Sequence, residues 1–160
     1  MPETARPSVT LIDAAALSRL PAPGPEEGPE GIVIVAGSGI VDMVLAGLAL
    51  PGAQMIWTDF RQSSALGRLH QRIDALGGLD RLVLSADGAR AEAVFSMMCA
   101  ILSLLPALRR PGRAQVTLLL DDGPAVASLQ EFLRRLVPRL SRDGISVGLE
   151  VTVPPAVPAG

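Results

Sequence analysis

Hydrophobic residues along this chain form short continuous runs. Longer stretches lie between these runs, and there polar residues separate the hydrophobic ones. Aliphatic and β-branched runs occupy residues 32–35, 54–58, 81–85, 115–120 and 145–153. Runs of this length and composition are typical of strands that are covered on both faces of a sheet. The pattern therefore predicts about five short strands.

The stretches between these runs repeat their apolar residues at intervals of three and four, which indicates helices. We predict helices over residues 40–50, 63–76, 91–109 and 125–140. Strands that alternate with helical crossovers pair in parallel, and helices then cover both faces of the sheet. The expected fold class is α/β, a doubly wound parallel sheet in three αβα layers.

Proline and glycine mark the limits of this domain. Residues 21–31 read PAPGPEEGPEG, a composition that supports neither a helix nor a strand and indicates a linker. Apolar residues within 11–20 could line a short helix, which either docks on the domain or its dimer partner or stays disordered. We divide the chain into an N-terminal segment and linker at 1–30, a domain at 31–153 and a Pro-rich tail at 154–160.

Composition excludes several classes of function. The net charge is −2, so the chain lacks the basic field that nucleic-acid binding needs. All 14 basic residues are Arg, which, in an Ala- and Pro-rich chain, suggests a GC-rich bacterial genome. Residues 93–108 form the longest apolar stretch, too short to span a membrane, and the first 20 residues do not form a signal peptide.

The chain contains one cysteine, Cys99, and one histidine, His70. They allow neither a disulfide within the chain nor a structural zinc site, so we expect a cytoplasmic protein without a metal. Cys99 lies in an apolar helix, where we expect a buried small hydrophobe. His70 lies at the polar side of its helix, where we expect a surface residue.

Five segments, in order, resemble the short-chain dehydrogenase/reductase family. The stretch LDRLVLSADG at 79–88 resembles the family's LDxLVNNAG, and TDF at 58–60 resembles its Asp-Val strand end. GR at 112–113 and AVASLQEF at 125–132 resemble the GRIV strand and the YxASKAAL helix, and DGISV at 143–147 is similar to GIRV. The resemblance covers about residues 31–153 and implies a Rossmann-like fold.

The catalytic residues of that family are missing here. The resemblance places Ala125 and Leu129 where the family has the Tyr and Lys that transfer the proton, and the chain contains no Tyr and no Lys at any position. Ser128 has no neighbouring base to activate it. The family's catalytic serine would lie after the fourth predicted strand, where this chain has Asp121 and Asp122 and a much shorter loop. We therefore assign no catalytic residue.

The nucleotide-binding end of the family pattern is also altered. Gly37, Ser38 and Gly39 follow the first predicted strand and resemble a shortened form of the family's glycine-rich loop. The strand that normally ends in the ribose-selecting residue is absent from the predicted order, and Asp59 would match the position that meets the adenine. These four residues are the candidate NAD(P)-binding residues. The simpler interpretation is that the glycines form a tight turn and that Asp59 is an ordinary turn carboxylate.

Other carboxylates have two interpretations. Asp87 can cap the following helix or face the ligand cleft, and we favour the cap. Asp121 and Asp122 can bind a metal or act as an acid–base pair, and we favour solvated turn residues. We expect no cofactor, with NAD(P) as the alternative.

The helix at 91–109 is apolar on nearly all of its faces, whereas a helix on a sheet needs only one apolar stripe. The resemblance implies a homodimer through helices 91–109 and 125–140, with Arg residues of the second helix at the rim. The function that we predict is a non-catalytic, dimeric binding, scaffolding or regulatory module, in effect a pseudoenzyme, which could also have a protein partner. The alternative is an NAD(P)-dependent oxidoreductase with atypical catalytic residues.

Overall fold

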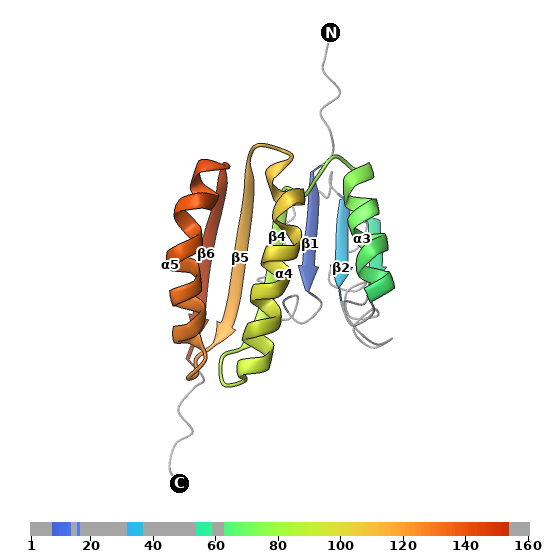
Figure 1. Cartoon of the computed structure of the whole chain (residues 1–160). Coiled ribbons are helices and arrows are strands. Elements are labelled where there is room, and N and C mark those ends of the chain that lie inside the picture. Colours follow the sequence, from blue (N-terminus) through green and yellow to red (C-terminus); the bar gives the residue numbers. More distant parts are fainter. Residues whose placement is uncertain (1–7, 14–15, 17–31, 37–53, 59–62, 154–160) are drawn as a thin grey trace, which may run out of the picture.

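A computed structural model describes residues 8–13, 16, 32–36, 54–58 and 63–153 of the chain (Figure 1). In this part of the chain, six parallel strands form one sheet in the order β3-β2-β1-β4-β5-β6. The strands are β1 (Val9–Asp13), β2 (Ile32–Ala36), β3 (Gln54–Thr58), β4 (Arg81–Asp87), β5 (Ala114–Asp121) and β6 (Ile145–Thr152). This is the strand order of the doubly wound dinucleotide-binding fold.

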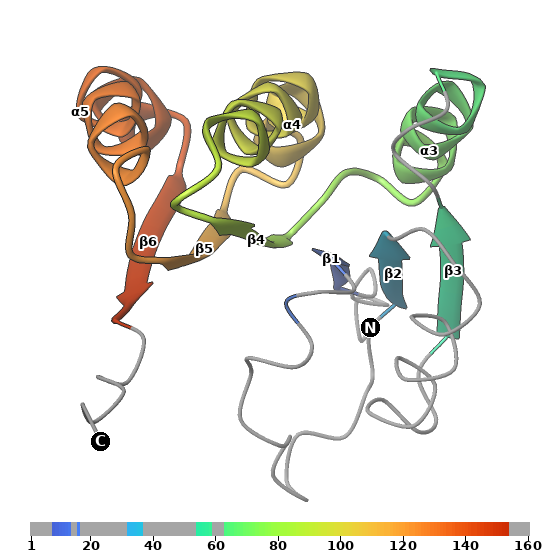
Figure 2. The same ribbon diagram turned by 90° about the horizontal axis from the view of Figure 1, so that it is seen from below.

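Three helices are described in full, and all three cover the same face of the sheet (Figure 2). They are α3 (Ser63–Ala75), α4 (Ala91–Arg109) and α5 (Val126–Arg142). Each lies within two residues of its predicted bounds. The α3 helix ends at Gly77 and Gly78, whose positive φ angles of 92° and 114° are readily adopted only by glycine. The helix predicted over residues 40–50 and the linker at 21–31 lie outside the described residues.

The structure corrects the interpretation of the N-terminal segment. Residues Val9–Asp13 do not start a helix; they form β1, which pairs with β2 on one side and with β4 on the other. Val9 and Leu11 are fully buried on one face of the sheet, and Ile12 is buried on the opposite face. The sheet therefore has six strands rather than five, and one of its two central strands, β1, comes from the N-terminal segment that the sequence pattern separates from the domain.

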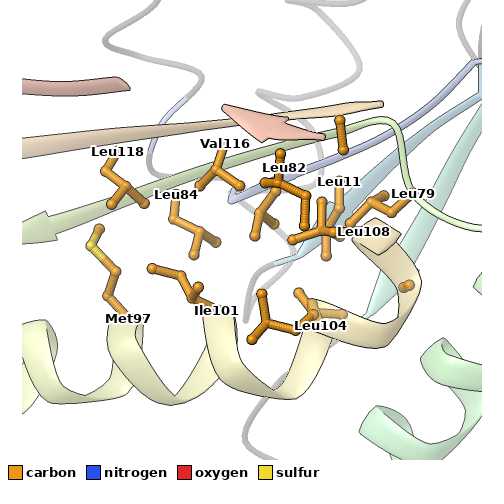
Figure 3. Packing of buried hydrophobic residues seen from close by; sticks show 14 of the residues in the cluster. Leu11, Leu79, Leu82, Leu84, Met97, Ile101, Leu104, Leu108, Val116 and Leu118 are labelled. Carbon is orange, nitrogen blue, oxygen red and sulfur yellow. The ribbon is translucent and has the colours of Figure 1, made fainter. Parts of the chain in front are cut away.

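The main hydrophobic core lies between the sheet and the three helices. Side chains of β4 and β5 point toward α4, whose inner face interlocks with them (Figure 3). The residues of this contact are Leu82, Leu84, Val116 and Leu118 on the strands and Met97, Ile101, Leu104 and Leu108 on the helix. Each fully buried Leu or Ile contributes about 1.5–3 kcal/mol through the hydrophobic effect, so this layer fixes α4 firmly on the sheet.

A second, smaller core lies on the opposite face of the sheet. It contains Ile12, Val35, Val83 and Leu119 from four strands, together with Ala16, which is helical and fully buried. The sheet thus buries side chains on both faces, as the predicted layers require. This coverage does not reach the far edge, because every second residue of β6 is exposed, whereas the residues between them are buried or partly buried; the exposed residues are Ser146, Gly148, Glu150 and Thr152. The expectation that every strand is covered on both faces is wrong for β6.

The α4 helix is long and apolar enough to cross a membrane by length and composition. Its seven buried residues nevertheless pack in the core: Val94, Met97, Ile101, Leu104, Leu105, Ala107 and Leu108. The α4 helix is therefore a core helix, as predicted, although the expectation that its apolar stretch is too short to span a membrane is wrong. Its outer side bears the exposed Phe95 and Leu102.

Candidate functional site

The strand order identifies one edge of the sheet as the place for a ligand. The chain leads from β1 outward to β2 and β3, then returns to the centre and leads outward again from β4 to β6. The carboxyl ends of β1 and β4 therefore lie side by side at the topological switch point, where ligands bind in open α/β sheets. The candidate site is built from the ends of these two strands and from α4.

The sequence directly after β1 lacks the glycines that help to hold a dinucleotide. A pyrophosphate binds there on backbone N–H groups that glycines leave accessible, at the N-terminus of the next helix. In this chain β1 ends at Asp13, the residues that follow are Ala14, Ala15 and Ala16, and no glycine occurs before Leu20. Ala16 is already helical and fully buried. The sequence after β1 therefore lacks the glycines of a phosphate cradle, and these residue types do not fit NAD(P).

The topology also changes the assignment of the predicted glycine-rich turn. Gly37, Ser38 and Gly39 lie outside the described residues, but the strand that they follow is β2, which lies on the side of β1 away from β4. They follow the second strand of the sheet rather than the first, and their binding of a dinucleotide stays a prediction. The strand thought to be missing is present as β2. Asp59 also lies outside the described residues, directly after β3, and its role stays a prediction.

Between β4 and β5 the carboxyl edge is closed by main chain. The Gly88 N–H donates to the Asp121 carbonyl at 3.1 Å, and the Ala125 N–H donates to the Gly88 carbonyl at 2.8 Å. A Cβ atom added at Gly123 would lie 2.3 Å from the Gly88 carbonyl carbon and 2.3 Å from the Ala89 nitrogen. The two turns are therefore in direct backbone contact, and only residues without a side chain fit at Gly88 and Gly123.

Ala125 and Leu129 lie next to this closed edge. They are the two positions where the short-chain dehydrogenase/reductase family has its proton-transferring Tyr and Lys. Ala125 is 8% exposed and Leu129 is fully buried, and both belong to the main core. The neighbouring Ser128 is exposed on α5. The start of α5 therefore packs inward as structural core, and it presents no acid, base or nucleophile to the carboxyl edge.

A cavity of about 560 Å³ remains at the switch point. It lies between the ends of β1 and β4 and one side of α4, and its lining is mostly apolar. The polar groups in its wall are Asp13, Ser85, Ser96 and Ser103, together with the thiol of Cys99. None of these lining residues is basic, so the cavity suits an apolar group better than a phosphate.

One of these hydroxyls is bonded to the only histidine. His70 Nε2 lies 3.0 Å from Ser103 Oγ, and both side chains are half-buried. A serine nucleophile would also need an oxyanion hole of free N–H groups and an acid that orients the imidazole. Ser103 lies in the middle of α4, where backbone N–H groups are used within the helix. The pair therefore serves to join α3 to α4, which sequence reasoning had missed because the residues are 33 positions apart.

The structure corrects two further expectations. Cys99 is exposed rather than buried. Asp87 does not cap α4, because its Oδ1 accepts from the Ala89 N–H at 2.9 Å and so holds the turn ahead of the helix. Asp122 agrees with the favoured interpretation, a solvated turn residue, because it is exposed and its Oδ1 accepts from the Gly123 N–H at 2.9 Å. Within the described residues, no three His, Cys, Asp or Glu side chains come together as a metal site.

Comparison with solved structures agrees with this fold. The chain resembles a hydroxysteroid dehydrogenase from Escherichia coli with a TM-score of 0.63 at 17% identity, over 89% of this chain and 69% of the other. It resembles the bulky-bulky ketone specific alcohol dehydrogenase from Comamonas testosteroni with a TM-score of 0.62 at 15% identity, over 96% of this chain and 77% of that enzyme. A short-chain dehydrogenase from Streptomyces avermitilis gives 0.59 at 15% identity, over 99% and 74%.

The chain therefore has a Rossmann-like α/β fold of the kind found in short-chain dehydrogenases/reductases. No family model matches its sequence, and no curated protein matches it either. The likeness is one of fold, at identities of 15% to 18% in the structures compared.

Proposed function

We propose that this chain is a non-catalytic protein that keeps the fold of short-chain dehydrogenases/reductases and acts as a dimeric binding, scaffolding or regulatory module. The observation that carries the proposal is the backbone contact between Gly88 and Gly123. It occupies the edge of the sheet above Ala125 and Leu129, where the resembling enzymes place a substrate loop and their proton donors. A reacting group has neither space nor a proton source there.

The sequence after β1 supports the same proposal. Asp13 is followed by three consecutive alanines, where the resembling family has its glycine-rich loop, so we propose that the chain does not use NAD(P). Asp87 and Asp121 at the ends of β4 and β5 add negative charge along this edge. A doubly charged pyrophosphate would be repelled rather than held.

The partner that we propose is a second copy of the chain, which contacts the outer sides of α4 and α5. Phe95 is 65% exposed and Leu102 is 48% exposed, which is unusual for large apolar side chains on a monomer's central helix. The single exposed thiol, Cys99, fits a reducing compartment such as the cytoplasm.

Two measurements on the purified chain test the proposal. Isothermal titration with NADH and NADPH should show no heat of binding, and the absorbance of NADPH should not fall with a panel of ketones and aldehydes. An active short-chain dehydrogenase run in parallel controls both assays. Binding together with hydride transfer would overturn the proposal and would support the alternative, an NAD(P)-dependent oxidoreductase with atypical catalytic residues.

A further inference from the structure

The cavity at the switch point runs along α4 rather than along the edge of the sheet. Its lining on α4 extends from Ala93 to Leu104, which corresponds to about 16 Å of helix at about 1.5 Å per residue. A dinucleotide in this fold lies across the carboxyl ends of the strands instead. The cavity therefore enters the layer between the sheet and the helices and takes a different course from that of a nucleotide crevice.

Small side chains on one side of α4 leave this space open. The cavity is lined by four small residues at intervals of three, four and three along the helix: Ala93, Ser96, Ala100 and Ser103. The neighbouring side of the helix bears the large core side chains seen in Figure 3. A large aliphatic residue at the small positions would fill the volume, so the choice of residues on α4 is the local cause of the cavity.

The lining is apolar where it is deepest. Leu84 and Leu104 are at most 4% exposed and form the floor, whereas Phe95 and Cys99 are exposed and mark the opening to solvent. A cavity of this volume, about 560 Å³, with an apolar floor and a few polar groups, has the usual form of a small-molecule site. Most of the surface of its ligand is therefore hydrocarbon.

The charge of the cavity is negative. Among the described residues of the lining, Asp13 is the only charged one, and it is half-buried at the end of β1. Asp87 and Asp121 are paired in register at the ends of β4 and β5 and add negative charge at the same edge. Arg90, ahead of α4, is exposed and does not belong to the lining. A protonated amine complements this charge, whereas a carboxylate or a phosphate is repelled.

The polar groups of the wall suit the donors of an ammonium group, which has three N–H bonds. Asp13 makes another interaction, but a carboxylate has about four lone-pair positions, so acceptor capacity remains for an amine. Ser85 and Ser96 are the hydroxyl acceptors that the same wall offers. Ser103 differs from them, because its Oγ lies 3.0 Å from His70 Nε2 and joins α3 to α4.

We propose that this cavity binds an apolar amine, a molecule with a compact hydrocarbon body and one protonated amino group directed at Asp13. The inference rests on the proposed non-catalytic binding function and names its class of ligand. The hydrocarbon body lies on the apolar floor beside the small residues of α4, and the ammonium group meets the carboxylate at the end of β1. Binding of this kind requires no catalytic residue.

Three probes with one hydrocarbon cage and different head groups test the charge of the ligand: adamantylamine, adamantanol and adamantanecarboxylate. Isothermal titration of the full chain at pH 7 should give the amine a Kd at least about tenfold below that of the carboxylate, with the alcohol between them. Asp13→Asn keeps the size of the side chain and removes its charge, so the amine and the alcohol should then differ by less than about threefold. Asp122→Asn, at an exposed carboxylate outside the lining, should change none of the three Kd values.

A variant that fills the cavity tests its position. Ala100→Leu should raise the Kd of the amine about tenfold or more, while the urea midpoint stays the same or rises, because the new side chain occupies empty space. Ala75→Leu is the matched control, at an exposed alanine of α3 outside the lining, and should leave the Kd unchanged. A loss of binding without a loss of stability excludes unfolding as its cause.

The outcomes separate this inference from the proposed function. The amine site is overturned if no probe binds, if the carboxylate binds as well as the amine, or if Ala100→Leu binds the amine unchanged, and the non-catalytic proposal would then stand. A preference for the amine that survives Asp13→Asn would also overturn it; if that variant does not fold by circular dichroism, the three probes and Ala100→Leu still decide. Displacement of the amine by NADPH, together with NADPH oxidation, would overturn both.

Discussion

Replacing Gly123 with alanine tests whether the carboxyl edge between β4 and β5 is closed by main chain. The new Cβ would lie 2.3 Å from two backbone atoms and 2.5 Å from the Gly88 carbonyl oxygen. Contacts between real Cβ atoms and backbone are rarely shorter than 3.0 Å. The two turns would therefore have to separate by most of an ångström, and neither is a flexible side chain that could rotate away.

The size of the effect follows from what that separation breaks. The hydrogen bond from Gly88 to Asp121 and the bond from Ala125 to Gly88, at 3.1 and 2.8 Å, both join the same two turns. Each contributes about 1 kcal/mol net, and overpacking of a rigid site costs about 1–3 kcal/mol. We expect Gly123→Ala to lower the free energy of unfolding by about 2–4 kcal/mol.

Urea unfolding followed by circular dichroism measures this change. Gly67→Ala is the matched control, because Gly67 lies exposed in α3 and a Cβ there would meet no atom within 4 Å. Alanine in a helix interior is preferred over glycine, so the control should gain about 0.5–1 kcal/mol. If Gly123→Ala unfolds within about 0.5 kcal/mol of the original protein, the edge is open and the argument for a closed catalytic site fails.

Three other experiments probe the same structure. The pair Ala125→Tyr with Leu129→Lys restores the family's side chains but places them in the core, so we expect no NADPH oxidation and a loss of at least about 3 kcal/mol in urea unfolding. A double-mutant cycle with His70→Ala and Ser103→Ala should give a coupling energy of about 0.5–1.5 kcal/mol, whereas additive effects would mean that the two side chains do not interact. Asp80→Ala removes the acceptor that lies 2.7 Å from the first N–H of β1 and should cost about 1–3 kcal/mol; an unchanged urea midpoint would contradict that role.

The predictable part of this fold is the part with strong periodicity. The prediction for α4 matches the observed bounds because an apolar stretch of 19 residues is much longer than a strand. β1 was missed because Val9–Asp13 is a five-residue run, and short apolar runs fit a strand and one side of a helix equally well. Val9–Asp13 forms a strand because it pairs with β4, about 70 residues later in the chain, and such long-range pairing leaves no local signal in the sequence.

The error at β1 carried over to the candidate site. Once β1 was left out, β2 became the first strand and Gly37–Gly39 became the nearest likeness to a phosphate loop. The signal that could have prevented this lies in the count of strands, because a Rossmann-like half normally has three strands before the switch point, and only two were assigned. A strand before residue 31 would have completed the set.

The sequence also could not predict which residues of α4 are exposed to solvent. The sequence shows that α4 is apolar nearly all round, but it cannot show which residues the sheet covers. The structure divides them: Val94, Ile101 and Leu108 face the core, whereas Phe95 and Leu102 face outward. The structure thus shows what the sequence pattern leaves open: one side of α4 belongs to the core, and the other side leaves two large apolar side chains exposed to solvent.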